Sequence, residues 1–198
     1  MRTNAILSEM RDGKLAHGCQ IQFASPTLVE WIGMAGFDFL YLDGEHGVFS
    51  YESVEDTCRV AELAGLTPIM RAPSIEPHDI LRLLDRGIMG IVGPHITTTD
   101  DARRLVDACY YGPAGSRSMS ATRASYYGQF SSDTEHMEQA NSQILVVALV
   151  EDIGVLDHLD EVASTEGIHL YGVGEKDTAQ SMGLPGQPDH PRVKELQG

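Results

Sequence analysis

The chain has 198 residues, 42% of them hydrophobic and 22% charged, which is enough to bury one substantial core and predicts a single domain over residues 1–198. Acidic residues outnumber basic ones by 29 to 14, and the net charge of −15 repels nucleic acid and anionic membranes, so neither is expected as a partner. No apolar run approaches the roughly 18 residues of a membrane span, and residues 1–15 are too polar for a signal peptide. We therefore expect a soluble cytoplasmic protein whose three widely spaced cysteines are reduced thiols.

Short apolar runs of strand length alternate along the chain with amphipathic segments, in which apolar residues recur three and four positions apart. The runs predict strands at residues 19–23, 37–42, 67–70, 90–92, 144–150 and 168–173. The amphipathic segments predict helices at residues 26–35, 51–64, 76–85, 99–109 and 154–164. Residues 111–143, rich in Gly, Ser, Tyr and Met, predict a long loop with one helical piece. This order predicts a parallel sheet, either open and doubly wound or closed into a barrel.

Polar residues gather directly after the predicted strands. Charged groups at the end of a buried strand are costly unless they bind or react, and parallel α/β folds place their active sites at the carboxyl ends of the strands. From the second strand to the sixth, these residues are Asp43, Glu45 and His46; Arg71; Pro94 and His95; Glu151 and Asp152; and residues 174–177. The sequence therefore predicts an active site at this edge of the sheet.

Two of these acids, Glu151 and Asp177, follow the fifth and sixth predicted strands. Carboxylates at neighbouring strand ends can bind a hard divalent cation such as Mg²⁺ or Mn²⁺, with water or substrate in the remaining positions. Either acid can instead cap the helix that follows its strand. The presence of Arg71 and His46 at the same edge favours the metal site.

Arg71 leaves an apolar strand just before a proline turn, and its planar guanidinium suits a carboxylate or a carbonyl oxygen of a substrate. The alternative is a structural ion pair with an acid such as Asp43. His46 lies between Glu45 and Gly47, and neighbouring acids can fix the tautomer of its imidazole for general acid–base catalysis. A purely structural histidine is the alternative here.

Other conspicuous residues carry less information. His95 and His169 are ambiguous, and neither is assigned a role. The glycine-bearing segments at residues 112–118 and 172–177 lack the spacing of a phosphate-binding loop, so no nucleotide site is expected.

Six segments carry a likeness to a known family: FDFLYLDGEHG, PIMRAP, DILRLLDRGIMGIVGPHI, GPAGSRS, LVVALVED and GVGEKDTAQSMGLPGQPDHP. Together, in this order and over essentially the whole chain, they resemble the HpcH/HpaI aldolase family. Its members are metal-dependent class II pyruvate aldolases on a (β/α)8 TIM barrel, similar to 4-hydroxy-2-oxoheptanedioate and 2-keto-3-deoxy-sugar-acid aldolases. The resemblance implies a carbon–carbon lyase that cleaves a 4-hydroxy-2-oxo acid to pyruvate and an aldehyde through an enolate, or runs the reverse addition.

The resemblance also implies roles for individual residues and a divalent cation, Mg²⁺, Mn²⁺ or Co²⁺, as cofactor. Arg71 would bind the keto oxygen of pyruvate, and His46, partnered by Asp43, would serve the acid–base step through water. The metal ligands would be Glu151 and Asp177, and the substrate-binding residues Arg71, Gly174 and Lys176. A cation and an arginine on one oxyanion lower the cost of forming an enolate, so this set is chemically coherent. The resemblance further implies a homo-oligomer, a hexamer built from dimers.

The chain departs from the family pattern in three places. Leu149 stands where such aldolases typically carry Gln, two residues before the metal-binding Glu, and residues 174–178 read GEKDT where the family usually reads GPADL. A barrel of this type takes about 250 residues, whereas six βα units can be counted here. We therefore expect a TIM-barrel fold that lacks the last two βα units.

These departures leave two other functions open. Leu149 and the charged pair Glu175 and Lys176 favour a condensing enzyme, similar to the citrate synthase of siderophore pathways that this family contains. The short chain is also compatible with a non-catalytic assembly subunit.

Overall fold

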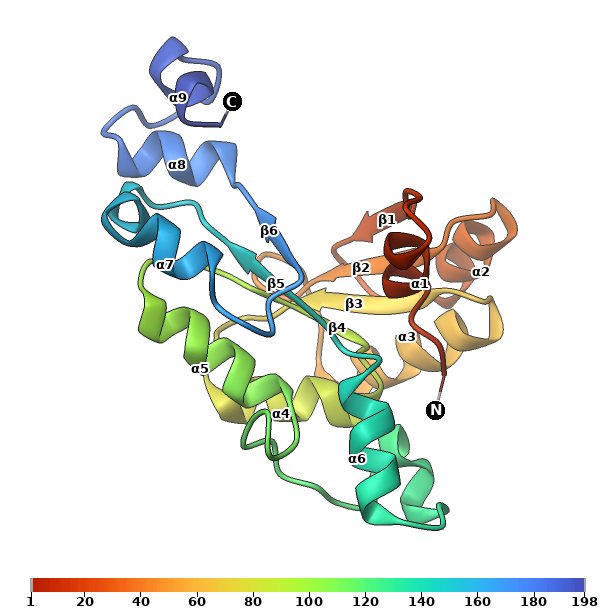
Figure 1. Ribbon diagram of the computed structural model, residues 1–198. Coiled ribbons are helices and arrows are strands. Elements are labelled where there is room, and N and C mark those ends of the chain that lie inside the picture. The colour runs from red at the N-terminus through yellow and green to blue at the C-terminus, as the bar shows by residue number, and fades with distance from the viewer. Residues whose placement is uncertain (1, 198) are drawn as a thin grey trace.

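The computed structural model describes residues 2–197, and its six strands form one curved parallel sheet with helices against the outer face (Figure 1). The strands are β1 (Gly18–Ile21), β2 (Phe39–Asp43), β3 (Thr67–Arg71), β4 (Gly90–Gly93), β5 (Leu145–Leu149) and β6 (Leu170–Gly172). Each strand pairs with the next one in the sequence, so β1 and β6 are the two edges of the sheet. The six predicted strands and their parallel arrangement are thus confirmed.

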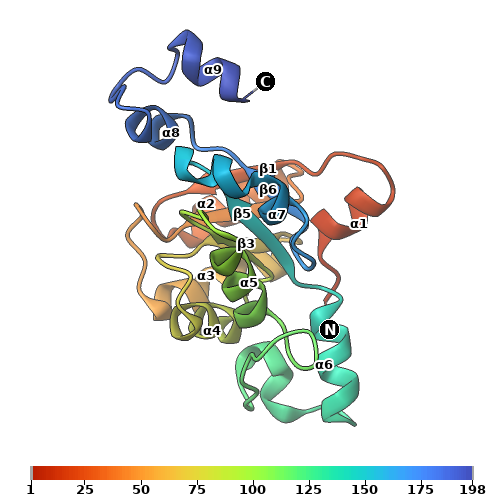
Figure 2. The same cartoon turned by 60° about the vertical axis from the view of Figure 1, so that its left-hand side comes forward.

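Helices connect the strands as the sequence predicts. Those on the outer face are α2 (Pro26–Met34), α3 (Tyr51–Leu63), α4 (Pro77–Arg86), α5 (Thr99–Cys109) and α7 (Leu159–Ala163). The remaining helical elements are α1 (Ala5–Arg11), α6 (Asp133–Asn141), α8 (Glu175–Ser181), α9 (Pro191–Gln197) and the 3₁₀ segments η1 (Arg123–Gly128) and η2 (Ile153–His158). Figure 2 shows α8 and α9 beyond the end of β6, at the opposite end of the molecule from α6.

The helix boundaries follow from local chemistry. The Ser25 hydroxyl accepts a hydrogen bond from the N–H of Leu28, and Pro26 occupies the first position of α2. Thr98 forms a capping box with Asp101 at the start of α5. Gly87 ends α4 with φ = 111°, a left-handed conformation that favours glycine. These signals explain why α2, α4 and α5 begin and end close to the predicted residues.

The two faces of the sheet bury different sets of residues, because side chains alternate along a strand. In β2, Leu40 and Leu42 belong to the large core under the outer helices. Phe39 and Tyr41 point to the inner face and belong to a smaller cluster with Ile69 and others. This inner face borders an apolar cleft of about 390 Å³.

Helix α1 closes the amino end of the sheet. Its Ile6 packs into the inner cluster, and Asn4, the capping residue of α1, donates from Nδ2 to the carbonyl oxygens of Met89 and Gln143 at 2.9 and 3.0 Å. Both carbonyls lie just before strands, so α1 is fixed below the strand starts. The carboxyl end of the sheet is left uncovered by α1 and can hold an active site.

Three parts of the structure differ from the predicted elements. Residues 111–143, for which one helical piece was predicted, contain two, η1 and α6. The helix expected at residues 154–164 is divided into η2 and α7, because Asp152 caps a 3₁₀ turn before the α-helix begins. The short helices α1, α8 and α9, with seven residues each, were not predicted, since seven residues give little helical periodicity. Among the helices of residues 2–197, none has the length and apolar character needed to cross a bilayer.

Candidate active site

The carboxyl ends of β2 and β3 bring Asp43 and Arg71 together. These are the last residues of their strands, and they are register partners in the sheet. Arg71 donates from Nε to Asp43 Oδ1 over 3.0 Å and from Nη2 to Oδ2 over 2.7 Å. The ion pair that the sequence left open as an alternative is therefore present, and it is bidentate.

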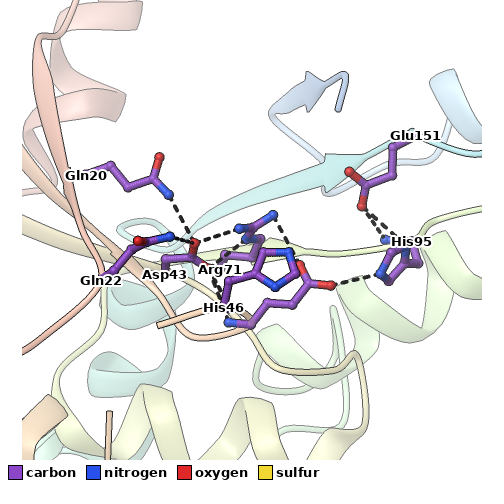
Figure 3. Close-up of polar contacts among 8 residues, drawn as sticks. Gln20, Gln22, Asp43, His46, Arg71, His95 and Glu151 are labelled. Atoms are coloured by element: carbon purple, nitrogen blue, oxygen red, sulfur yellow. Dashed lines mark hydrogen bonds and ion pairs between the residues drawn. The ribbon is translucent and has the colours of Figure 1, made fainter. Parts of the chain in front are cut away.

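Asp43 is fully buried and accepts further hydrogen bonds (Figure 3). Gln20 and Gln22 donate to Oδ2 at 3.2 and 3.3 Å, and the backbone N–H groups of Glu45 and His46 donate to Oδ1 at 3.3 and 3.2 Å. Burial by itself raises the pKa of Asp43, but the hydrogen bonds from Arg71, His46 and Gln22 outweigh it and lower the pKa to about 2. Asp43 is thus a stable anion that fixes the arginine.

His46 lies on the loop after β2 and lines the same cleft as Asp43 and Arg71. Its contact with Asp43 is made by its backbone N–H and not by its imidazole. The ring is therefore free to turn toward water or a substrate in the cleft. Its acid–base role, with Asp43 as partner, stays a prediction.

Glu151 lies on the opposite side of the cleft, two residues after β5, and is 3% exposed. The backbone N–H of His95 donates to its Oε1 over 3.3 Å. Burial raises the pKa of Glu151, the charges of Asp177 and Glu45 act in the same direction, and His95 opposes them. A buried carboxylate beside two other acids is an electrostatic setting that suits a cation.

Gly174 makes room for this carboxylate. A β-carbon at position 174 would overlap Oε2 of Glu151 and come within 3.1 Å of its Cβ. Gly174 also precedes α8, whose first turn carries Lys176 and Asp177. The sequence therefore brings Glu151, Gly174, Lys176 and Asp177 to one wall.

The predicted residues of both walls border one open cleft of about 430 Å³. Tyr41, on the inner face of β2, also lines it, and burial raises the pKa of this phenol to about 12. Leu149 contributes an apolar side chain next to Glu151. The full lining is Gln20, Gln22, Tyr41, Asp43, His46, Arg71, Leu149, Glu151, Val173, Gly174, Glu175, Lys176 and Asp177.

Two residues outside the predicted catalytic, metal-binding and substrate-binding set, Glu45 and His95, connect the walls. Glu45 Oε2 lies 3.2 Å from Arg71 Nη1, and Glu45 Oε1 lies 2.9 Å from His95 Nε2. His95 Nδ1 in turn lies 3.4 Å from Glu151 Oε1. The only signal in the sequence was their place after predicted strands, since contacts across the sheet depend on strand order and register.

The donor set is compatible with a divalent cation. Over residues 2–197, no three or more His, Cys, Asp or Glu side chains are grouped as metal ligands. Two carboxylates, from Glu151 and Asp177, leave several positions of a hard cation for water and substrate, as Mg²⁺ accepts in proteins. The buried and acid-flanked setting of Glu151 supports this fit.

A parallel βα sheet that gathers acids and an arginine at the carboxyl ends of its strands is the arrangement of an α/β enzyme of barrel type. The family model for HpcH/HpaI aldolase/citrate lyase matches residues 17–197. The chain belongs to this family. The family resemblance inferred from the sequence is thereby confirmed, and with it the assignment to a family of aldolases and lyases.

Relatives of known name agree with this assignment. The chain is 34% identical over 179 residues to the 5-keto-4-deoxy-D-glucarate aldolase of Salmonella arizonae, a match that covers 90% of this chain and 69% of the relative. The enzyme of the same name from Salmonella paratyphi A is 33% identical with the same coverage.

Solved structures share the fold. An HpcH/HpaI aldolase/citrate lyase family protein from Burkholderia cenocepacia J2315 is 30% identical, with a TM-score of 0.90 over 98% of this chain and 78% of that one. The citrate synthase SbnG is 28% identical, with a TM-score of 0.87 over 98% of this chain and 76% of the other. The six-stranded parallel sheet is therefore that of the family.

Proposed function

We propose that this protein is a divalent-metal-dependent aldolase that cleaves a 4-hydroxy-2-oxo acid to pyruvate and an aldehyde, or catalyses the reverse addition. The observation that carries the proposal is the pair of facing walls in one cleft, one with the oriented Arg71 and the other with the buried Glu151 beside Asp177. The named relatives, which are aldolases of a keto sugar acid, support the same reaction class.

In this proposal each residue has a distinct task. Glu151 and Asp177 hold the cation, which when bound supplies positive charge to the keto acid. Arg71 donates to the keto oxygen and stabilises the negative charge that develops there as the carbon–carbon bond breaks. Because Asp43 and Glu45 fix its guanidinium, Arg71 needs no reorganisation when that charge forms.

The other predicted residues complete the site. His46 moves the proton of the 4-hydroxyl group through water, since its imidazole faces the cleft and is not engaged by Asp43. The backbone amides around Gly174 and Lys176 face the carboxylate of the keto acid, at the start of α8. Lys176 adds a positive charge at the exposed mouth of the cleft.

We also propose that the six strands correspond to the first six of an eight-stranded barrel. Their sequential parallel order and the two edges at β1 and β6 support this correspondence. In such a barrel two further βα units would lie between β6 and β1. Residues 1–198 would then belong to one barrel domain, and the homo-oligomer implied by the family resemblance stays a prediction.

The proposal is tested by metal removal. We expect EDTA to abolish the release of pyruvate from 4-hydroxy-2-oxo acids, and Mg²⁺, Mn²⁺ or Co²⁺ to restore it after the chelator is removed, because the cation is needed to stabilise the enolate. Pyruvate is measured with a coupled dehydrogenase, and the coupling enzyme is assayed alone with EDTA as a control. Turnover that is indifferent to the chelator would contradict the proposal.

A second candidate is a condensing enzyme. Its support is the structural likeness to citrate synthase SbnG, together with apolar Leu149 and charged Glu175 and Lys176 on the lining of the cleft. Product analysis with oxaloacetate and an acyl-CoA donor separates the two reactions. A citrate-like product without pyruvate release from hydroxy-oxo acids would favour the condensing enzyme over the aldolase.

A further inference from the structure

His95 is placed between two acids that come from different parts of the chain. Its Nε2 lies 2.9 Å from Glu45 Oε1, and its Nδ1 lies 3.4 Å from Glu151 Oε1 (Figure 3 shows the Glu151 contact). An ionised carboxylate only accepts hydrogen bonds, so a ring nitrogen that bonds to either acid does so as the donor. His95 therefore connects the arginine wall, through Glu45, to the wall that carries Glu151.

The backbone of His95 supports a specific role for this placement. Its φ of 54° lies in the left-handed region, which is uncommon for a residue with a side chain and persists where surrounding contacts favour it. The side chain is 59% exposed, so burial in the core does not explain its position. The contacts with Glu45 and Glu151 hold the imidazole between these two acids.

The two oxygens of the Glu151 carboxylate have different surroundings. Oε1 receives the backbone N–H of His95 at 3.3 Å and faces its imidazole. Oε2 faces Gly174, where a β-carbon would overlap it. Asp177 lies in the helical turn that follows Gly174. The oxygen of Glu151 that His95 does not contact, Oε2, is therefore the one on the side of Asp177.

We propose that His95 is a positioning residue for the metal ligand Glu151. It holds Oε1 with its N–H and its Nδ1, so that Oε2 is directed toward Gly174 and Asp177 as the ligand atom. Through Nε2 and Glu45 it also fixes the distance between this ligand and Arg71. The inference rests on the proposed function in one respect, the assignment of Glu151 as a ligand.

Two substitutions of His95 each keep one of its ring-nitrogen contacts and remove the other. In His95→Asn the amide nitrogen lies as many bonds from the backbone as Nδ1, so the contact with Glu151 can be kept while that with Glu45 is lost. In His95→Gln the amide reaches the position of Nε2, so the contact with Glu45 can be kept and that with Glu151 is lost. His95→Gly removes both, and glycine accepts the left-handed backbone.

The experiment is a direct titration of the full chain with Mn²⁺ in the absence of substrate, read by calorimetry and by the EPR signal of free Mn²⁺. We expect His95→Gly and His95→Gln to weaken Mn²⁺ binding about 10–100-fold, as loss of an outer contact to a metal ligand does, and His95→Asn to bind within about threefold of the parent. Tyr127→Gly is the matched control, because Tyr127 also has a left-handed backbone, with φ of 55°, but lies outside the cleft. This control should bind Mn²⁺ like the parent.

The outcomes distinguish the inference from the function on which it rests. If the parent binds Mn²⁺ and His95→Gln binds it equally well or more tightly, the positioning role is wrong and the metal site stands. If His95→Asn is as weak as His95→Gln, the Nδ1 contact does not position Glu151 and the inference is also overturned. If the parent itself does not bind Mn²⁺, both the metal site and the role of His95 are wrong. The comparison of His95→Asn with His95→Gln tests the positioning role even if His95→Gly does not fold.

Discussion

Arg71 and Asp43 form a bidentate ion pair at the ends of β3 and β2, with donor–acceptor distances of 3.0 and 2.7 Å. The acid is fully buried and the arginine side chain is 14% exposed, so the exposed part of the pair belongs to Arg71. The residue that would bind substrate is thus held by an acid whose side chain is not exposed to solvent. We therefore expect substitutions of Asp43 to lower the stability of the fold and substitutions of Arg71 to lower turnover.

The first prediction concerns Asp43→Asn. Removing the charge leaves Arg71 partly buried without its main partner, and we expect the free energy of unfolding to fall by about 3 kcal/mol. Urea denaturation followed by circular dichroism measures this change. Asp189→Asn is the control, because Asp189 is an exposed partner of Lys194 and its loss should change stability by less than about 0.5 kcal/mol. Equal effects of the two substitutions would show that the buried pair does not stabilise the fold.

The second prediction is a pH dependence that Asp43 confers. Its folded pKa of about 2 lies below the value of about 3.9 for an unfolded aspartate, so the folded state binds its proton less readily. This contribution of about 3 kcal/mol is complete above about pH 5 and is lost as the pH falls through 4 toward 2. The stability difference between the parent and Asp43→Asn should therefore shrink in urea titrations from pH 6 to pH 3. A difference that stays constant over this range would contradict the assigned pKa.

Much of the scaffold follows from sequence patterns alone. Strand β2 could be predicted because apolar residues fill both faces over residues 39–42, and α5 because apolar residues recur three and four positions apart over residues 99–109. The position of Arg71 at a strand end then followed from the strand itself. Local chemistry thus determines the elements, and their order determines which edge carries the polar residues.

The contacts across the site could not be predicted in the same way. His95 and Glu151 are 56 positions apart, and their hydrogen bond exists because β4 and β5 are neighbours in the sheet. Glu45 reaches both Arg71 and His95 through the shape of the loop after β2, which no periodicity encodes. Register and loop geometry, which depend on the whole fold, decide how the predicted residues meet.

The third prediction concerns Arg71→Lys. Lysine keeps the positive charge, which limits the cost of leaving Asp43 buried. It lacks the planar guanidinium, whose several N–H groups can bind Asp43, Glu45 and a substrate oxygen at the same time. We expect kcat for pyruvate release to fall about 10²–10³-fold, as loss of an oxyanion donor does, and Mn²⁺ affinity to stay within about threefold. Arg104→Lys, at an exposed arginine paired with Glu76, is the matched control. Unchanged turnover in Arg71→Lys would remove Arg71 from the chemistry.

The last prediction concerns Gly174→Ala. The backbone at position 174 has φ of −92°, which alanine adopts without strain, so the fold should tolerate the change. The added β-carbon overlaps Oε2 of Glu151 and must displace the carboxylate, so we expect Mn²⁺ affinity to fall about 10-fold or more while the thermal midpoint stays close to that of the parent. Gly112→Ala is the control, since its β-carbon would meet an ordinary contact at 3.7 Å outside the cleft. If Gly174→Ala binds Mn²⁺ as the parent does, Oε2 of Glu151 is not the ligand atom, and the cation must be sought on another part of the cleft.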